Sequence, residues 1–311
     1  MSREKKRIVI TGPTGAIGMA LIKKCIEQRT AVLAICHKGS KRIANIPKNP
    51  LVEVLELDLA DYHTFEPKGI EKYDVFYHLA WNGTFGDTRN DMPLQVKNIR
   101  YTLDAVALAK RLGCHTFVGA GSQAEYGRVE GLLRPDTPAF PENGYGMAKL
   151  CAGQMSRTVC EQLGMNHIWT RILSVYGPYD GKDTMVMSSI RKMLTNEPTE
   201  FTKGEQLWDY LYSEDAADAL LALGTDGVHG KVYCLGSGEA HPLSWYIEIM
   251  HKLSNSTADI GLGKMPYRDK QVMHLQADIS ELQKDVGFEP KTSFEKGISQ
   301  ILERGKTEWT C

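Results

Sequence analysis

The chain has 311 residues, of which 42% are hydrophobic and 24% charged, and its formal net charge at pH 7 is −1. That length allows one large domain or two modest ones, and the balanced charge argues against an overall basic protein that binds nucleic acid. The sequence holds no apolar run near the ~20 residues that a membrane-spanning helix needs. The N-terminal stretch MSREKKRIVITG leads into a strand and does not resemble a signal peptide.

Cysteine and histidine usage argues against disulfides and metals. The cysteines are odd in number, scattered and without a Cys-x-x-Cys spacing: Cys25, Cys36, Cys114, Cys151, Cys160, Cys234 and Cys311. This pattern favours reduced thiols in a cytoplasmic protein. The nine histidines show no metal-ligand spacing, so we expect no metal site.

The first half of the chain alternates short β-branched runs with helical patterns. Strands are expected in the stretches RIVITG, TAVLAIC, LVEVLELD, YDVFYHLA and HTFVGAG, and helices in AIGMALIKKCIEQ and IRYTLDAVALAKRLG. Alternation of this kind predicts βαβ units and a parallel sheet covered on both faces. We therefore expect an α/β fold with a Rossmann-like, doubly wound parallel sheet.

The second half has a different rhythm. A long helix from about Tyr145 to Leu163 and one strand over 165–177 are expected to complete a first domain at 1–177. After it, helical stretches mix with short strands and Gly/Pro turns, which predicts a smaller α+β lobe over most of 178–311. A strand near 231–237 is expected to return to the main sheet.

The loop TGPTGAIG follows the first expected strand directly. Gly12, Gly15 and Gly18 are spaced as in a dinucleotide-binding turn, where glycines let backbone N–H groups approach a pyrophosphate at a helix N-terminus. The alternative is a plain Gly-rich turn between strand and helix. The remaining loop residues expected to contact the nucleotide are Thr14, Ala16 and Ile17.

The end of the second expected strand bears on which nucleotide binds. An NAD-binding protein usually places a carboxylate there for the ribose hydroxyl, whereas this chain offers His37, Lys38 and Arg42. Such cations would attract a 2′-phosphate, so NADP is favoured and NAD remains possible. The alternative is a solvated basic loop. Asp58, followed by Leu59, is expected either to accept from the adenine amino group or to cap the next turn.

Polar residues follow two later strands, and a helix begins close behind them. Ser122 ends HTFVGAGS, Asn82 follows HLAW, and the stretch GYGMAKL places Tyr145 and Lys149 one turn apart on one helix face. A Tyr and a Lys four residues apart are common by chance. The order of the Gly-rich loop, the serine and the helical pair resembles the extended short-chain dehydrogenase/reductase family. The resemblance lies with its NAD(P)-dependent nucleotide-sugar epimerases, dehydratases and 4-ketoreductases.

The resemblance extends over nearly the whole chain, including TRILSVYGP and EQLWDYLYSEDAADALLAL. It implies that Tyr145 exchanges a proton with a carbonyl oxygen, that Ser122 holds that oxygen, and that Lys149 lowers the pKa of Tyr145 and reaches the ribose. It also implies an NAD(P)-binding role for residues 1–177 and a substrate-binding role for most of 178–311. The further residues implied to line the cofactor are Leu79, Ala80, Trp81 and Asn98.

Departures from the family pattern concern the substrate. Gln123 and Ala124 stand where dehydratases of the family carry an Asp-Glu pair, which disfavours dehydration. Trp208 replaces an Arg, and Ser174 replaces an Asn, at positions that commonly touch the nucleotide half. Trp208 is expected to stack on a base or sugar, or else to be core. The residues expected to contact substrate are Asn82, Gln123, Ser174, Trp208 and Arg268, with Arg268 placed to bind a diphosphate.

The leading functional expectation is NADPH-dependent 4-keto reduction of a nucleotide-activated deoxysugar. The alternatives are epimerisation of a nucleotide sugar by oxidation and re-reduction, reduction of a non-nucleotide carbonyl, and a non-catalytic NADP-sensing role. By analogy with the family, a homodimer is expected to form through the helices that carry Asn98 and Tyr145.

Overall fold

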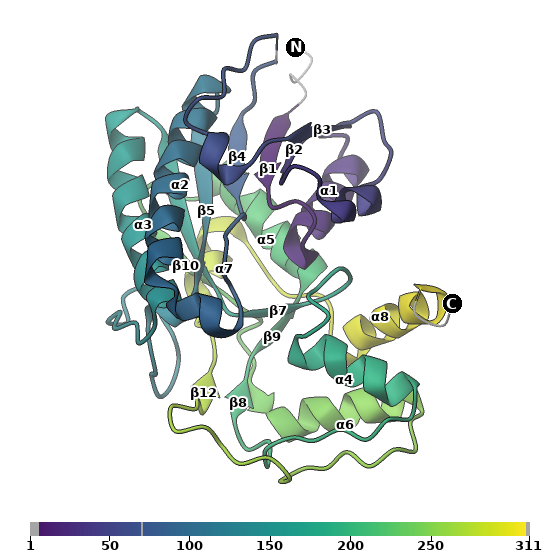
Figure 1. The fold of residues 1–311 in the computed structure, drawn as a ribbon. Helices are drawn as coiled ribbons and strands as arrows, with labels where there is room; N and C mark the ends of the chain where they lie inside the picture. Colours follow the sequence, from purple (N-terminus) through teal and green to yellow (C-terminus); the bar gives the residue numbers. More distant parts are fainter. Residues whose placement is uncertain (1–5, 70, 309–311) are drawn as a thin grey trace.

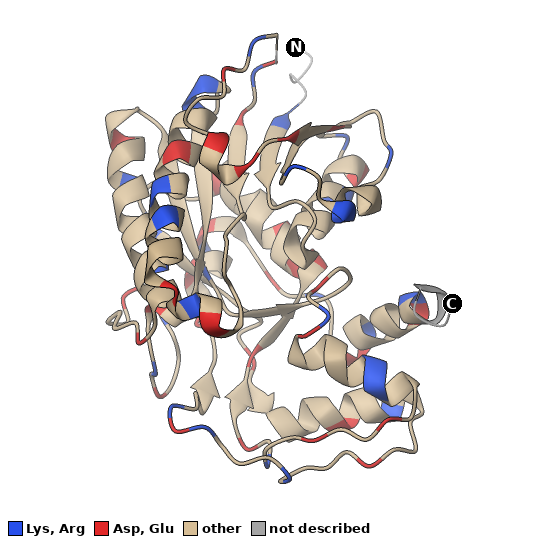
Figure 2. Cartoon of the chain, viewed as in Figure 1, with Lys and Arg blue, Asp and Glu red and all other residues tan. Residues whose placement is uncertain are grey.

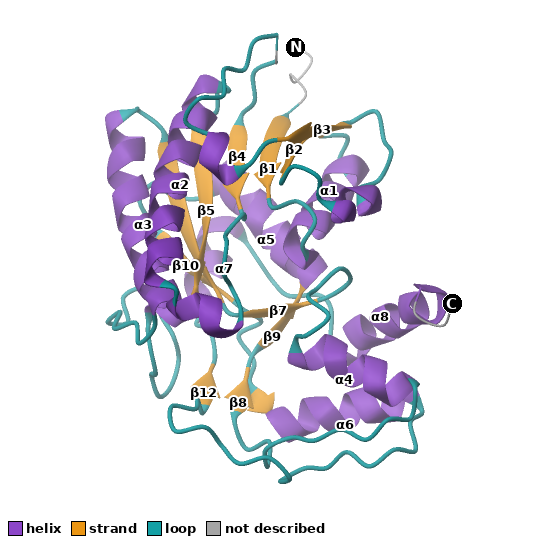
Figure 3. Ribbon diagram, viewed as in Figure 1, coloured by secondary structure: helices purple, strands orange, loops and turns teal. Residues whose placement is uncertain are grey.

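The computed structural model describes residues 6–69 and 71–308, so Cys311 lies outside the described residues. Its centre is a seven-stranded sheet in the order β10-β6-β5-β4-β1-β2-β3, in which every pair is parallel (Figures 1 and 3). This is the doubly wound sheet that the strand–helix alternation predicts. The strands are β1 Arg7–Thr11, β2 Ala31–Cys36, β3 Val52–Glu56, β4 Val75–His78, β5 Thr116–Ser122, β6 Asn166–Ile172 and β10 Val232–Leu235.

Helices cover both faces of the sheet. On one face α2 (Met92–Arg111) packs beside α3 (Gly144–Gln162), and on the other α1 (Ala16–Glu27) packs beside α5 (Ser213–Asp226) (Figure 1). Strand β1 shows how the sequence divides between them: Ile8 and Ile10 belong to one apolar cluster and Val9 to the other. The period of two along a strand produces this division.

Two boundaries differ from the sequence-based expectation. Helix α2 begins at Met92, well before the expected start at Ile99, because Asp91 accepts a hydrogen bond from the Leu94 N–H at 3.1 Å and Pro93 stands in the first turn. The single strand expected over 165–177 is two strands. β6 ends at Ile172, and β7 (Ser174–Tyr176) leaves the sheet to pair with β9 (Tyr210–Tyr212).

The smaller lobe is built around its own apolar cluster, which includes Tyr176, Ile190, Tyr246, Phe294 and Ile298. The chain after residue 178 does not lie wholly in this lobe, because α5 packs against α1 and β10 pairs with β6. The remaining elements are α4 Met185–Leu194, β8 Leu207–Trp208, β11 His241–Pro242, α6 Leu243–Ser254, β12 His274–Leu275, α7 Ser280–Val286 and α8 Phe294–Glu308, with short 3₁₀ helices η1 Lys41–Asn45, η2 Leu59–Asp61, η3 Gly86–Asn90 and η4 Gln123–Glu125.

The charge distribution is mixed. Basic and acidic residues are dispersed over the elements visible in Figure 2, in keeping with the net charge of −1. Within residues 6–69 and 71–308, no helix combines the length and apolar character that crossing a membrane requires. The same residues contain no group of three or more His, Cys, Asp or Glu arranged to hold a metal ion.

Candidate active site

The turn between β1 and α1 has the shape of a phosphate-binding loop. Gly12 has a φ of +67°, and a Cβ there would lie 2.9 Å from the Ala80 backbone nitrogen. Gly15 is the N-cap of α1; no described side chain caps this helix, and its first turn holds no acidic residue. The helix N-terminus therefore offers its N–H groups and its positive dipole end to an anion. The loop fits a pyrophosphate, and Thr14, Ala16 and Ile17 lie half-buried around it.

The ends of β1 and β4 are held together beneath this loop. Thr11 Oγ1 accepts hydrogen bonds from the backbone N–H groups of Leu79 and Ala80, each at 3.2 Å. The same hydroxyl lies 3.0 Å from His78 Nδ1. Burial lowers the pKa of His78 to about 3, so its ring is neutral at pH 7. Leu79 and Ala80 are thereby fixed, half-buried, directly beside the glycine loop.

Asn98 holds the loop that follows β4. Its side-chain amide accepts from the Asn82 N–H at 3.1 Å and donates to the Asn82 carbonyl at 2.8 Å. Asn98 is 1% exposed. Because both ends of its amide are occupied, we infer that Asn98 positions the loop rather than touching the cofactor. Asn82 itself is exposed.

The basic loop after β2 is paired with carboxylates. Lys38 Nζ lies 2.5 Å from Asp61 Oδ2, and the Lys38 N–H donates to Asp58 at 2.9 Å. His37 Nε2 is 3.6 Å from the same Asp58 carboxylate. Asp58 precedes Leu59, the first residue of η2, and Asp61 is the last, so neither carboxylate stands at the end of β2 in the sequence.

Arg42 is also engaged. Its Nη2 donates to the Tyr179 carbonyl at 2.5 Å, which ties η1 to the loop after β7. The three cations expected to receive a 2′-phosphate thus already have partners within the protein. This arrangement weakens the argument for NADP that the sequence alone suggested.

Ser122 and Tyr145 meet where β5 and α3 approach each other. Asn143 caps α3 by accepting from the Gly146 N–H at 2.9 Å. A Cβ at Gly146 would overlap the Ala124 carbonyl oxygen, so glycine permits the close approach of α3 to η4. The Tyr145 phenol then lies near enough to Ser122, which is 9% exposed, for the serine hydroxyl to favour the phenolate. The pair lies at the carboxyl edge of the sheet, where doubly wound folds bind ligands.

The electrostatics around Tyr145 differ from the expected arrangement. Burial raises the pKa of Tyr145, while the Ser122 hydroxyl and the charge of Arg89 act to lower it. The Arg89 guanidinium lies over the Tyr145 ring, 4.4 Å from its centre. Lys149, which was expected to supply this charge, has its Nζ 5.8 Å from the ring centre.

Lys149 is buried one turn along α3. Its Nζ donates to the Ala120 carbonyl at 2.6 Å and lies 3.8 Å from the centre of the Trp81 ring. Burial lowers the pKa of Lys149 to about 7, against the opposing negative charge of Glu125. Trp81 also meets the Tyr145 ring edge-on at 6.1 Å, so it contacts both side chains that the sequence paired.

The expected substrate residues are only partly brought together. Trp208 Nε1 donates to Ser174 Oγ at 2.8 Å, so the two departures from the family pattern contact each other. Gln123 is half-buried in η4, directly after Ser122. Arg268 lies on an exposed turn before β12, and among the described residues the structure gives its side chain no partner.

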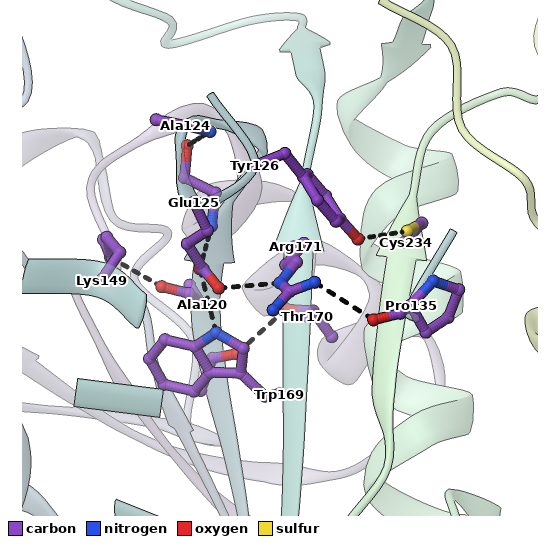
Figure 4. A network of polar contacts seen from close by, with 12 residues as sticks. Ala120, Ala124, Glu125, Tyr126, Pro135, Lys149, Trp169, Thr170, Arg171 and Cys234 are labelled. Carbon is purple, nitrogen blue, oxygen red and sulfur yellow. Dashed lines mark hydrogen bonds and ion pairs between the residues drawn. The ribbon is translucent and has the colours of Figure 1, made fainter. Parts of the chain in front are cut away.

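A buried network behind Ser122 was missed by the sequence reasoning. Glu125 joins Arg171 of β6 and the backbone of Ser122 (Figure 4). The Ser-x-x-Glu spacing of a capping box was a readable signal for it. Arg89 offered no such signal, because its contact with Tyr145 depends on tertiary packing.

A cavity of about 920 Å³ lies elsewhere. It is bounded by Tyr210, Trp245, Tyr246 and Phe294 together with the loops at 237–241 and 276–280. Its lining includes none of Ser122, Tyr145 and Lys149.

Together, the glycine loop at the N-terminus of α1 and the Ser-Tyr-Lys group at the carboxyl edge of the sheet define a dinucleotide-binding enzyme fold. Residues 8–236 match the model of the NAD dependent epimerase/dehydratase family, and the chain belongs to that family. The enzyme class and the Rossmann-like fold expected from the resemblance are thereby confirmed.

Known proteins resemble the chain along almost its entire length. The dTDP-4-dehydro-6-deoxyglucose reductase of Escherichia coli is 24% identical, with 97% of this chain and 98% of that protein covered. The structure of UDP-glucose 4-epimerase from Thermotoga maritima with UDP-glucose superposes with a TM-score of 0.85, at 20% identity, over 97% of this chain and 99% of that one. UDP-glucuronic acid 4-epimerase from Bacillus cereus, in complex with UDP-glucuronic acid and NAD, gives a TM-score of 0.84 at 23% identity over the same shares.

Proposed function

We propose that this protein epimerises a nucleotide-activated sugar by oxidation and re-reduction at one carbon, with NAD as the cofactor it retains. The observation that carries the choice of cofactor is the pairing of Lys38 with Asp61 and of Arg42 with the Tyr179 carbonyl. A 2′-phosphate would have to displace these partners, whereas the ribose hydroxyls of NAD would not. Epimerases predominate among the similar solved structures, which supports the same choice.

The residues of the site fit the proton side of this reaction. NAD(P), when bound, accepts a hydride from the sugar carbon and returns it. Tyr145 takes the proton of the sugar hydroxyl and gives it back, while Ser122 donates a hydrogen bond to the same oxygen. Lys149 would hold the ribose hydroxyls of the bound cofactor. Gln123 and Ala124 supply no acid or base for elimination of water.

Reduction of a 4-keto nucleotide sugar is the second candidate. The similarity to the Escherichia coli reductase over nearly the full chain favours it. In that case NADPH would exchange freely, and no epimer of the substrate would form. A carbonyl substrate without a nucleotide is the third candidate. Trp208 and Ser174 are uncharged and bond to each other, so neither offers the guanidinium that would bind a diphosphate at this position.

Cofactor retention and turnover separate these candidates. The purified protein is denatured and its released nucleotide is identified, and the protein is then incubated with UDP-, dTDP-, GDP- and CDP-hexoses while the products are followed by NMR. Retained NAD and a mixture of epimers support the proposal. Net consumption of NADPH with a 4-keto sugar, and no epimer, would establish the reductase instead. The variant Tyr145→Phe is the matched control, and unchanged biological activity in it would favour a non-catalytic sensing role.

We also propose a homodimer formed through α2 and α3. Large apolar side chains on these two helices are exposed in the single chain: Met92 48%, Val96 63%, Met147 48% and Met155 44%. Light scattering after gel filtration tests the assembly. Val96→Glu should produce a monomer if the helices form the interface.

A further inference from the structure

Glu125 is a fully buried carboxylate directly behind Ser122. It lies in η4, the short turn that continues from β5, and is 0% exposed. Its Oε1 accepts from the Ser122 backbone N–H at 2.8 Å and from the indole N–H of Trp169 at 3.0 Å (Figure 4). In return, Ser122 Oγ accepts from the Ala124 N–H at 3.2 Å. These reciprocal bonds fix both the backbone and the hydroxyl of Ser122.

The other oxygen of Glu125 is paired with Arg171. Arg171 Nε donates to Oε2 at 2.8 Å, and its Nη1 donates to the Pro135 carbonyl at 3.2 Å. Arg171 is 4% exposed, and its guanidinium lies 4.4 Å from the centre of the Tyr126 ring. The ion pair is therefore almost completely removed from water on both sides.

A buried ion pair is a poor explanation for stability alone. The cost of desolvating two charges is of the same order as their attraction, so apolar replacements of such pairs are often neutral or stabilising. Another reason to place a carboxylate here is the nearby ammonium of Lys149. Lys149 donates to the Ala120 carbonyl and Glu125 accepts from the N–H of Ser122, two residues further along β5, so the two charged groups approach the same stretch of that strand (Figure 4).

The charges that face Lys149 come from several elements. His78 on β4 is neutral, Tyr145 lies on the same helix, Arg89 faces Tyr145 from η3, and Arg171 on β6 is neutralised by Glu125. Glu125 is the charged group that raises the pKa of Lys149, in opposition to burial.

We propose that Glu125 is a positioning residue of the active site, which holds Ser122 opposite Tyr145 and places a carboxylate near the Lys149 amine as its counter-charge. The roles of Ser122 and Lys149 in turnover rest on the proposed function. The hydrogen bonds and the electrostatic coupling do not, and they can be measured without cofactor or sugar.

The test is the titration of Lys149 in the free protein. The chain is labelled with ¹³Cε-lysine, Lys149 is assigned from the loss of its signal in Lys149→Met, and its protonation midpoint is followed by NMR. In Glu125→Gln the midpoint should fall by about one pH unit or more, because the charge that opposes desolvation is gone. The matched control is Glu142→Gln, which removes a carboxylate paired with Arg128 on the surface and should leave the midpoint unchanged.

A second variant guards against misfolding. Glu125→Gln alone leaves Arg171 as an unpaired buried cation, which is strongly destabilising. Glu125→Gln with Arg171→Met removes both charges and should fold. The Lys149 midpoint should still fall, but by less than in Glu125→Gln, because the opposing cation of Arg171 is lost as well. An unchanged midpoint in a folded protein of either kind overturns the proposal.

Turnover adds an independent measurement. If the wild-type protein epimerises a sugar, the alkaline limb of kcat in Glu125→Gln should move to lower pH by the same amount as the Lys149 midpoint. If Glu125→Gln epimerises the sugar with an alkaline limb at the wild-type pH, the proposed role of Glu125 is wrong, while the proposed function stands. A shifted midpoint in a protein that turns over no nucleotide sugar contradicts the proposed function and leaves the coupling intact.

Discussion

The indole N–H of Trp208 donates a hydrogen bond to the Ser174 hydroxyl at 2.8 Å. Trp208 belongs to β8 and Ser174 to β7, and each differs from the residue that the family pattern has at its position. The Trp208 carbonyl in turn accepts from the Tyr246 hydroxyl at 2.7 Å. The replacements satisfy each other's polar groups, and neither leaves a cation free for a phosphate.

Restoring both positions should strengthen nucleotide binding. The double variant Trp208→Arg with Ser174→Asn is expected to bind UDP about tenfold more tightly than the wild type, because a charged donor adds about 1.5–3 kcal/mol. Each single variant should gain less affinity for UDP, since only one of the two contacting residues is restored. Titration calorimetry with UDP measures the effect. If the double variant binds no more tightly than the wild type, the nucleotide is held elsewhere or is absent from the substrate.

The glycine loop allows a separation of binding from folding. A Cβ at Gly15 would come no closer than 3.9 Å to another atom, and the φ of Gly15 is −84°, which any residue adopts. Gly15→Ala should therefore fold with a stability within about 1 kcal/mol of the wild type, while a methyl group placed against the pyrophosphate weakens NAD binding. Urea unfolding and calorimetry with NAD provide the two measurements.

Gly18→Ala is the matched comparison. Its Cβ would lie 2.6 Å from the Gly12 carbonyl oxygen, so α1 would have to shift from the loop. Overpacking of this kind costs about 1–3 kcal/mol of stability. If Gly15→Ala binds NAD as well as the wild type does, the loop does not contact the pyrophosphate.

The parallel sheet was predictable from the sequence, but the pairing of the basic loop after β2 with the carboxylates after β3 was not. Strand–helix alternation indicated the parallel sheet, including the return of β10. Asp58 was expected to contact the adenine or to cap the next turn, and its pairing with the basic loop was missed because that loop follows a different strand. The parallel register places Cys36 opposite Glu56, and the following residues Lys38 and Asp58 come together beyond it. Analysis of each strand separately misses such partners, whereas alignment of neighbouring parallel strands in register would find them.

The candidate site shows the same limit. Ser122, Tyr145 and Lys149 could be proposed from spacing, since two of them share a helix face and the third ends a strand. The contact of Arg89 with Tyr145 and the pair of Glu125 with Arg171 join segments far apart in the chain. Only tertiary packing decides them, which is why the charge of Arg89 beside Tyr145 was not expected.

Arg89 should set the pH range of Tyr145. Its positive charge over the ring lowers the pKa of the phenol, against the effect of burial. Arg89→Met should raise that pKa, so that the sugar hydroxyl loses its proton less readily near pH 7 and the acid limb of kcat moves to higher pH. The expected loss at pH 7 is about three- to tenfold. Arg89→Lys, which keeps the charge, should retain part of the activity, and an acid limb that stays in place in Arg89→Met would contradict the role.

Lys149 should cost the protein stability near neutral pH. Its pKa is about 7 in the folded chain and 10.5 ordinarily, so the unfolded chain binds more protons between these values, and stability rises with pH across that window. At pH 7 the cost is on the order of 4 kcal/mol. Lys149→Met removes this cost but loses the hydrogen bond to Ala120 and the contact with Trp81, which together are worth about 2–3 kcal/mol.

We therefore expect Lys149→Met to be more stable than the wild type by about 1–2 kcal/mol at pH 7. The advantage should disappear, and then reverse, as the pH approaches 10.5, because the wild-type lysine is then neutral in both states. Urea unfolding at several pH values measures the difference, and Lys192→Met, a change at an exposed lysine of α4, serves as the control. A Lys149→Met protein whose stability depends on pH in the same way as that of the wild type would show that Lys149 keeps its ordinary pKa. In that case burial of Lys149 would not lower the stability of the protein at pH 7.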